Sequence, residues 1–280
     1  MIGATRLAPL FKSDLLLFPW EVLYEGDYRD GKPESFWGLR YPVARHLIPS
    51  KLYAMELALP TDMLFCLNHR LPYAPQQERP AIEILARKTG KFSLLRTLTH
   101  ISSGETFLEH LYQARHNVLH FACHCRPCKK YEDDIDALLI SLVEDETNLA
   151  QCKEIELETY NFDDIDGFFQ AEPLVFLNAC QSGGGLDELR KTFNLPARFI
   201  EHGAGAVIAT VCEVPDSFAA LFSKVFYEFF LDQKMMIGDA LHKTRWYFLT
   251  EYNNPLGLAY GLYSPAYYRL AQPPMMEGAA

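Results

Sequence analysis

The fold is decided by two stretches, Asn-Val-Leu-His-Phe-Ala-Cys-His at residues 117–124 and Pro-Leu-Val-Phe-Leu-Asn-Ala-Cys-Gln-Ser-Gly-Gly-Gly at residues 173–185. Each begins with an apolar run of strand length, and the runs lead to His124 and to Cys180. Unbroken apolar runs of this length are typical of strands in a parallel sheet that helices cover on both faces. We therefore expect both stretches to be strands of such a sheet.

Comparable apolar runs lie before, between and after these two stretches, at residues 63–67, 94–99, 137–143 and 206–211. Helical segments alternate with them. One carries a capping box made by Ser102 and Glu105, and another begins after Asp216 with a stripe of phenylalanines that we expect in the core. The alternation predicts an α/β fold with a mainly parallel sheet flanked by helices on both faces.

The chain has 280 residues, 49% of them hydrophobic, which suffices for the core of one large α/β domain. Residues 1–60 are less regular, and we expect them to form an N-terminal extension packed on the same domain, without its own core. Residues 61–280 then form the domain proper. We expect four polar residues at the surface: His69, Arg70, His242 and Arg245.

Charge and cysteine usage narrow the classes of partner. The net charge of −10 disfavours direct binding of nucleic acid, because such binding neutralises phosphates with basic side chains. No apolar run is long enough to cross a membrane, and the first residues lack the order of a signal peptide. The seven cysteines, an odd number, do not resemble a secreted disulfide framework, so we expect a cytoplasmic protein with a usable thiol.

His124 and Cys180 stand where parallel strands present reactive groups, at the carboxyl ends of the strands. A thiol needs a base to become a thiolate near neutral pH, and histidine is the usual base. The two positions are 56 residues apart, which leaves room for one further strand and crossover and would let them meet on neighbouring strands. The alternative is a small apolar core cysteine beside a buried structural histidine, and spacing alone does not decide between them.

A metal site is a competing interpretation of the cysteine-rich segment. Cys123, His124, Cys125 and Cys128 are close in sequence, but a structural zinc site draws paired ligands from two separated places, and the nearest further cysteine is Cys152. We rank zinc below catalysis.

Calcium is not supported at residues 161–173. The acidic segment 131–136 is interpreted as a solvated loop or, alternatively, as an activation or docking loop. We expect no metal and no cofactor.

The two deciding stretches resemble the CHAT family, bacterial relatives of caspases and separases. In caspases the nucleophile segment is Gln-Ala-Cys with a Gly soon after, and the histidine lies roughly 50 residues upstream. The resemblance extends to residues 203–210, 214–216 and 240–241 and, near the start, to residues 19–21 and 39–40. It covers nearly the whole chain and implies a caspase-like fold and a cysteine endopeptidase.

Carried over by residue, the resemblance implies that Cys180 is the nucleophile and His124 the base, while His120 lies inside its strand as a structural residue. The oxyanion would be held by the backbone amides of Cys180 and Cys125. The family has Gly where this chain has Cys125; if that position needs a positive φ, cysteine strains it, and the oxyanion hole would form only on activation.

The segment Cys-Glu-Val-Pro-Asp at residues 212–216 looks like the separase stretch Trp-Asp-Val-Thr-Asp, and separases cut after Arg. The resemblance implies that Glu213 or Asp216 receives a basic side chain at P1, the substrate residue before the cleaved bond. The alternative for Asp216 is a helix N-cap before Ser217.

The resemblance also implies a regulated effector of a bacterial defence or signalling system, including CRISPR-linked ones, that acts on a protein substrate. An activating sensor domain, repeat domain or partner protein would accompany it, and neither nucleic acid nor a membrane is a direct partner. Two other functions stay open: a catalytically silent caspase-like scaffold that signals by binding, and an acyltransferase or amidohydrolase that uses the same thiol.

Overall fold

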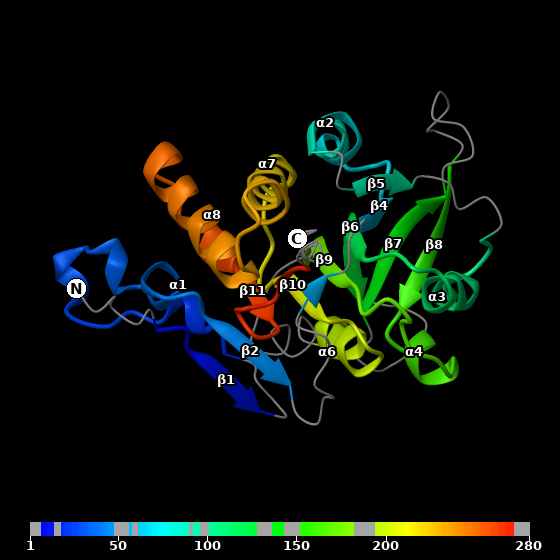
Figure 1. Ribbon diagram of the computed structural model, residues 1–280, viewed down its shortest axis with the longest axis horizontal. Helices are drawn as coiled ribbons and strands as arrows, with labels where there is room; N and C mark the ends of the chain where they lie inside the picture. The colour runs from blue at the N-terminus through cyan, green and yellow to red at the C-terminus, as the bar shows by residue number, and fades with distance from the viewer. Residues whose placement is uncertain are drawn as a thin grey trace, which may run out of the picture.

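The computed structural model of the protein describes residues 7–13, 18–47, 56–57, 61–89, 92–95, 101–127, 136–142, 152–181 and 194–271. A ten-stranded sheet runs through its centre in the order β1-β2-β11-β10-β9-β6-β4-β5, with β7 paired to β6 and β8 to β7 (Figure 1). The strands are β1 Leu10–Ser13, β2 Ala44–Leu47, β4 Thr61–Leu67, β5 Phe92–Leu95, β6 Val118–Pro127, β7 Asp136–Leu142, β8 Lys153–Glu158, β9 Leu174–Gln181, β10 Ala206–Thr210 and β11 Tyr260–Tyr263. A separate two-stranded sheet joins β3 Glu56–Leu57 to β12 Arg269–Leu270.

Most neighbouring strands are parallel; the pairs β10–β11, β6–β7 and β7–β8 are antiparallel. The helices are α1 Trp37–Arg40, η4 Ala74–Glu78, α2 Arg79–Thr89, α3 Gly104–Gln113, α4 Asn161–Asp164, α6 Asn194–Glu201, α7 Asp216–Tyr227, η6 Glu228–Asp232 and α8 Ile237–Tyr252, with short turns of 3-10 helix at η1 Trp20–Val22, η2 Tyr28–Asp30, η3 Pro33–Ser35 and η7 Pro255–Ala259. The predicted mainly parallel sheet between helices is confirmed.

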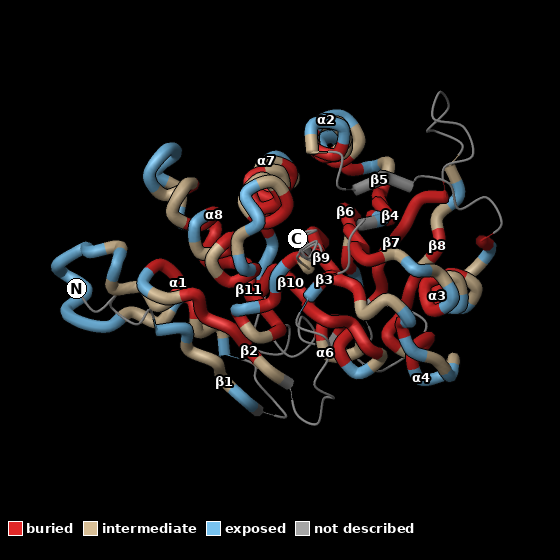
Figure 2. The backbone as a smooth tube through the Cα atoms, viewed as in Figure 1, coloured by how far each residue is buried: buried red, intermediate tan, exposed pale blue. Residues whose placement is uncertain are grey.

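The helices divide between the two faces of the sheet. Helices α2, α7 and α8 cover one, here called the α7 face, and α3, α4 and α6 cover the other, the α3 face (Figure 1). Each face has its own apolar core, and the central strands between them are buried along most of their length (Figure 2). Along β6 the side chains alternate between the cores, with Ala122 on the α7 face and Phe121 and Cys123 on the α3 face.

The first sixty residues contribute strands to this same sheet. Strand β2 is parallel to β11, where Arg45 lies opposite Tyr263, and β1 extends the edge beyond β2. Inside the fold, the carboxylate of Glu21 accepts hydrogen bonds from Arg45 and from Arg245 of α8. The expectation that Arg245 is a surface residue is wrong: it is 1% exposed, because its guanidinium is paired with Glu21 inside the fold.

Two local predictions need correction. The capping box of α3 is made by Ser103 and Thr106 rather than by Ser102 and Glu105, so that the helix begins at Gly104. Strands β6 and β9 also continue beyond the ends of their apolar runs, to Pro127 and Gln181, since β6 pairs with β9 as far as Cys125 and with β7 as far as Pro127. Among the described residues, no helix is long and apolar enough to cross a membrane.

Candidate active site

The two residues of the predicted dyad stand directly opposite each other in the sheet. Strands β6 and β9 are parallel neighbours, and their register pairs His124 with Cys180. Opposite positions on adjacent strands share a face, with backbones about 4.8 Å apart. The side chain of Cys180 and residues 182–193, including the predicted glycine-rich loop, lie outside the described part.

His124 belongs to the α7 face, at the carboxyl edge of the sheet. Side chains alternate along a strand, and His120, four residues earlier, contacts Tyr227 of α7 and Glu78 of η4 on that face. His124 itself is half-buried, whereas His120 is fully buried. A substrate could therefore reach residue 124 but not residue 120.

The backbone amides at the ends of β6 and β9 are directed toward each other. In a parallel ladder, successive residues alternate the strand to which they direct their N–H and C=O groups. The Leu174 amide donates to the Asn117 carbonyl at 2.8 Å, which sets the phase. From Leu174 onward, every second residue of β9 directs its N–H and C=O groups toward β6. By the register, the Cys180 amide therefore faces the Cys123 carbonyl, and the Cys125 amide faces the Cys180 carbonyl. Both predicted oxyanion donors thus point into the gap between the two strands, where strand pairing engages them.

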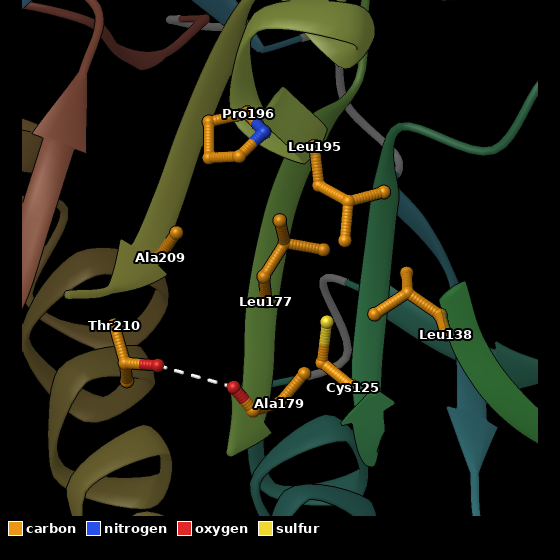
Figure 3. A pocket seen from close by; sticks show the side chains of 8 residues that line it. All are labelled: Cys125, Leu138, Leu177, Ala179, Leu195, Pro196, Ala209 and Thr210. Carbon is orange, nitrogen blue, oxygen red and sulfur yellow. Dashed lines mark hydrogen bonds between the residues drawn. The ribbon is translucent and has the colours of Figure 1, made fainter. Parts of the chain in front are cut away.

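Cys125 lies on the α3 face, away from His124. In the described part of the chain, the non-glycine residues with positive φ are Glu172, Lys234 and Asn253, so that Cys125 in its extended strand carries no left-handed strain. Its sulfur points into a small pocket on the α3 face, between the sheet and α6 (Figure 3). The pocket is lined by Cys125, Leu138, Leu177, Ala179, Leu195, Pro196, Ala209 and Thr210. Among the described residues, no charged side chain lines it.

The two acidic candidates for a basic P1 residue differ in their surroundings. Glu213 is exposed, while Asp216 is half-buried at the first turn of α7 and its carboxylate accepts a hydrogen bond from the Tyr73 amide at 2.7 Å. Burial raises the pKa of Asp216; the amides of Tyr73 and Ala74 and the nearby His124 oppose that rise. Asp216 thus interacts electrostatically with His124.

Asp216 is not the N-cap of its own helix. Helix α7 has Pro215 at that position, without a side-chain hydrogen bond. The carboxylate instead receives amides from the start of the segment Tyr73–Glu78, which follows β4. It therefore connects α7 to η4.

A buried polar cluster beneath the dyad was not predicted from the sequence. Glu78 Oε1 lies 2.9 Å from His120 Nε2 and accepts hydrogen bonds from Asn178 at 2.6 Å and from Ser223 at 2.5 Å. These residues come from η4, β6, β9 and α7. The available signal was the presence of polar residues, His120 and Asn178, inside two otherwise apolar strand runs.

The segment considered for zinc is split between the two faces. Cys123 and Cys125 are buried in the core of the α3 face, while His124 lies on the α7 face. Cys128 and the acidic residues 131–135 lie outside the described part, and Cys152 is half-buried just before β8. Within the described ranges, no three acidic, histidine or cysteine side chains come together as metal ligands.

Comparison with known proteins gives a family and a fold. The model of the CHAT domain matches residues 3–255. The separase of Saccharomyces cerevisiae, solved in complex with securin, aligns with a TM-score of 0.51 at 16% identity, over 92% of this chain but only 15% of the separase chain. RgpB of Porphyromonas gingivalis, solved with its pro-domain, aligns with a TM-score of 0.47 at 8% identity, over 81% of this chain and 56% of that one. No curated protein matches the sequence.

Proposed function

This chain belongs to the CHAT domain family, and from that premise we propose that it is a cysteine endopeptidase with Cys180 as nucleophile and His124 as base. The observation that supports it most is the register of β6 and β9, in which these two positions are direct neighbours at the carboxyl edge of the sheet. Neighbouring positions on one face bring a thiol and an imidazole within reach of proton transfer.

In the proposed reaction, His124 takes the proton of the Cys180 thiol and the thiolate attacks the peptide carbonyl carbon. The carbon–nitrogen bond then breaks, the leaving amine receives the proton from His124, and a thioester remains on Cys180. Water, deprotonated by His124, attacks the thioester and releases the carboxylic acid and the thiol. A third acidic residue is not needed for this sequence of proton transfers.

The oxyanion of each tetrahedral intermediate would be held by the amides of Cys180 and Cys125. Both amides point into the gap between β6 and β9, so separation of the last paired residues would leave two donors converging on one point. Donors arranged in this way are worth about a hundredfold or more in rate each. We propose that activation consists of this opening at the strand ends.

The proposed substrate is a protein with a basic residue at P1. A half-buried carboxylate such as Asp216, which interacts electrostatically with His124, can bind a guanidinium through two parallel hydrogen bonds. Glu213 is exposed and would act at longer range. Cleavage after Asp but not after Arg or Lys in a peptide panel would overturn this preference.

We further propose a regulated effector in a bacterial defence or signalling system, CRISPR-linked systems included, with a sensor domain or partner protein that triggers opening. The aligned separase structure contains the partner securin, and this chain spans only 15% of that separase chain. The engaged amides at the strand ends are consistent with such a trigger. They equally favour one alternative function, a caspase-like scaffold that binds without cutting.

Alkylation of Cys180 by iodoacetamide separates the peptidase from the scaffold. In the peptidase, Cys180 reacts at pH 6 to 7, well below the pKa of about 8.5 of a free thiol, and His124→Ala slows it at least about tenfold. Peptide mapping distinguishes the other thiols, and the exposed Cys212 is a weak competitor because burial and Glu213 raise its pKa. Alkylation at an ordinary thiol pKa, unchanged by His124→Ala, would point to the scaffold.

Mapping of new protein N-termini then tests cleavage itself. Cells or lysates with the wild-type chain and its activator should yield N-termini that Cys180→Ala does not produce. An identical set from both proteins would argue against an endopeptidase, even if the thiol is reactive.

A further inference from the structure

A carboxylate buried beneath the dyad joins the two strands that carry it. Glu78 is the last residue of η4 and is 1% exposed. A single oxygen, Oε1, lies 2.9 Å from His120 Nε2 and accepts hydrogen bonds from Asn178 Nδ2 and Ser223 Oγ at 2.6 and 2.5 Å. A carboxylate that receives several donors in an apolar interior forms strong, charge-assisted hydrogen bonds.

Two of the three donors belong to the dyad strands. His120 is four residues before His124 on β6, and Asn178 is two residues before Cys180 on β9. Since side chains two and four positions apart lie on one face of a strand, both donors share the α7 face with the dyad positions. Glu78 therefore bridges β6 and β9 within roughly two pleats, about 14 Å at most, of the proposed chemistry.

Two of the side chains that bind Glu78 have a further hydrogen-bond partner. The second ring nitrogen of His120 lies 3.0 Å from the Tyr227 hydroxyl, and the Tyr260 hydroxyl donates to Asn178 Oδ1 at 2.6 Å. The His120 ring is stacked between Phe65 and Phe176, with ring centroids 4.7 and 5.2 Å away. Because His120 and Asn178 are each bound by Glu78 and by a tyrosine hydroxyl, the network constrains the positions of both strands.

A contribution to the stability of the fold does not by itself explain why an acidic residue is buried at position 78. Replacing a buried charged group and its partners by well-packed apolar side chains is often neutral or stabilising, so a buried charge is weak evidence for a stabilising role. At its other end, the segment Tyr73–Glu78 is fixed by Asp216, which accepts the Tyr73 amide. Glu78 is thus anchored on one side to α7 and on the other to both dyad strands.

We infer that Glu78 is a positioning residue, one that sets the separation of β6 and β9 so that His124 can reach the Cys180 thiol. The inference rests on the proposed peptidase function. It assigns to Glu78 no contact with substrate: the carboxylate acts through His120 and Asn178.

The test is Glu78→Gln, which keeps the size of the side chain and removes its charge, so that three donors share one neutral amide oxygen. The matched control is Glu21→Gln, the same change at a second fully buried carboxylate, which pairs with Arg45 and Arg245 far from the dyad. For each folded variant, kcat and KM are measured on a basic-P1 peptide, together with the pH dependence of Cys180 alkylation.

We expect Glu78→Gln to lower kcat at least tenfold with KM changed less than threefold, and to shift Cys180 alkylation toward the profile of His124→Ala. Glu21→Gln should lower the melting temperature without either change per folded molecule. If Glu78→Gln does not fold, Asn178→Ala, which removes one bridging donor, is judged by the same two measurements.

Wild-type kcat and a wild-type alkylation profile in the folded variant would overturn the positioning role and leave the peptidase intact. Equal kcat losses in Glu78→Gln and Glu21→Gln would also overturn it, because the effect would then be one of general stability. If wild-type Cys180 reacts like a free thiol with or without His124, the proposed function fails, and the positioning role fails with it.

Discussion

The amide of Cys125 faces the carbonyl of Cys180 across the last paired positions of β6 and β9. A donor engaged in this way cannot also bind the oxyanion of a substrate. The proposed site therefore has its two residues in register but is closed at its edge.

Replacing Cys125 by Gly should raise the activity of the chain in the absence of any activator. Glycine in a strand weakens pairing by roughly 0.5–1 kcal/mol, which increases the open population about two- to fivefold. The measurement is kcat/KM on a basic-P1 peptide.

Cys66→Ala is the control for this variant. Cys66 is another buried thiol of the α3 face, on β4 opposite Phe121, four residues before Cys125, and burial raises its pKa so that it stays a thiol. Activation by both substitutions, or by neither, would contradict the strand-end mechanism.

Asp216→Asn should reduce cleavage after Arg and Lys selectively. Loss of one partner of a desolvated charge pair costs about 2 kcal/mol or more, roughly a thirtyfold fall in kcat/KM, while peptides with an apolar P1 are little affected. Glu213→Gln, at an exposed position, should change the rate less than about threefold.

The same carboxylate predicts a pH dependence. Burial raises the pKa of Asp216, so its carboxylate is protonated at a higher pH than an ordinary aspartate. Cleavage after a basic P1 residue should then fall as the pH decreases through this raised pKa, and Asp216→Asn should remove that limb. An acid limb that persists unchanged in the variant would assign the titration to another group.

Glu21→Ala should destabilise the fold by about 3–5 kcal/mol, because it leaves the guanidinium groups of Arg45 and Arg245 buried without their acid. Burial, together with Arg45, already lowers the pKa of Arg245 to about 10 although Glu21 opposes the change. Glu56→Ala, which breaks the surface pair with Arg269, should cost less than about 1 kcal/mol. Urea unfolding of both variants gives the comparison.

Deletion of residues 1–60 should prevent cooperative folding of the rest. The deletion removes β1 and β2 from the sheet, uncovers the edge of β11, and takes Glu21 away from Arg245. Circular dichroism during heating measures the effect. A sharp transition near that of the full chain would instead make the N-terminal residues a separable appendage.

The buried strands were predictable because both sheet faces are covered. Strands β4, β6, β7, β9 and β10 each contain a mostly apolar run, and such runs need no knowledge of their neighbours to be found. Strand β8 alternates charged and apolar residues at 153–158, and β2 and β11 have only four residues each. Strands β2 and β11 pair with each other from opposite ends of the chain, which local pattern does not encode.

The site was predictable in part for the same reason. The register of His124 and Cys180 follows from two apolar runs that end at equivalent points, whereas the contacts of Glu78 join residues 42, 100 and 145 positions apart. Arg245 was misplaced because its acidic partner lies 224 positions away. Polar residues inside apolar strands, such as His120 and Asn178, were the sign that a hidden network had to satisfy them.

Strand β6 changes partner along one of its sides: β4 pairs with it as far as Ala122, and β7 from His124 onward. The backbone of His124 is therefore joined directly to the antiparallel pair β7 and β8. A protein that bound to β7 and β8 would be coupled to that backbone through strand pairing, at a distance from the face on which His124 and Cys180 meet.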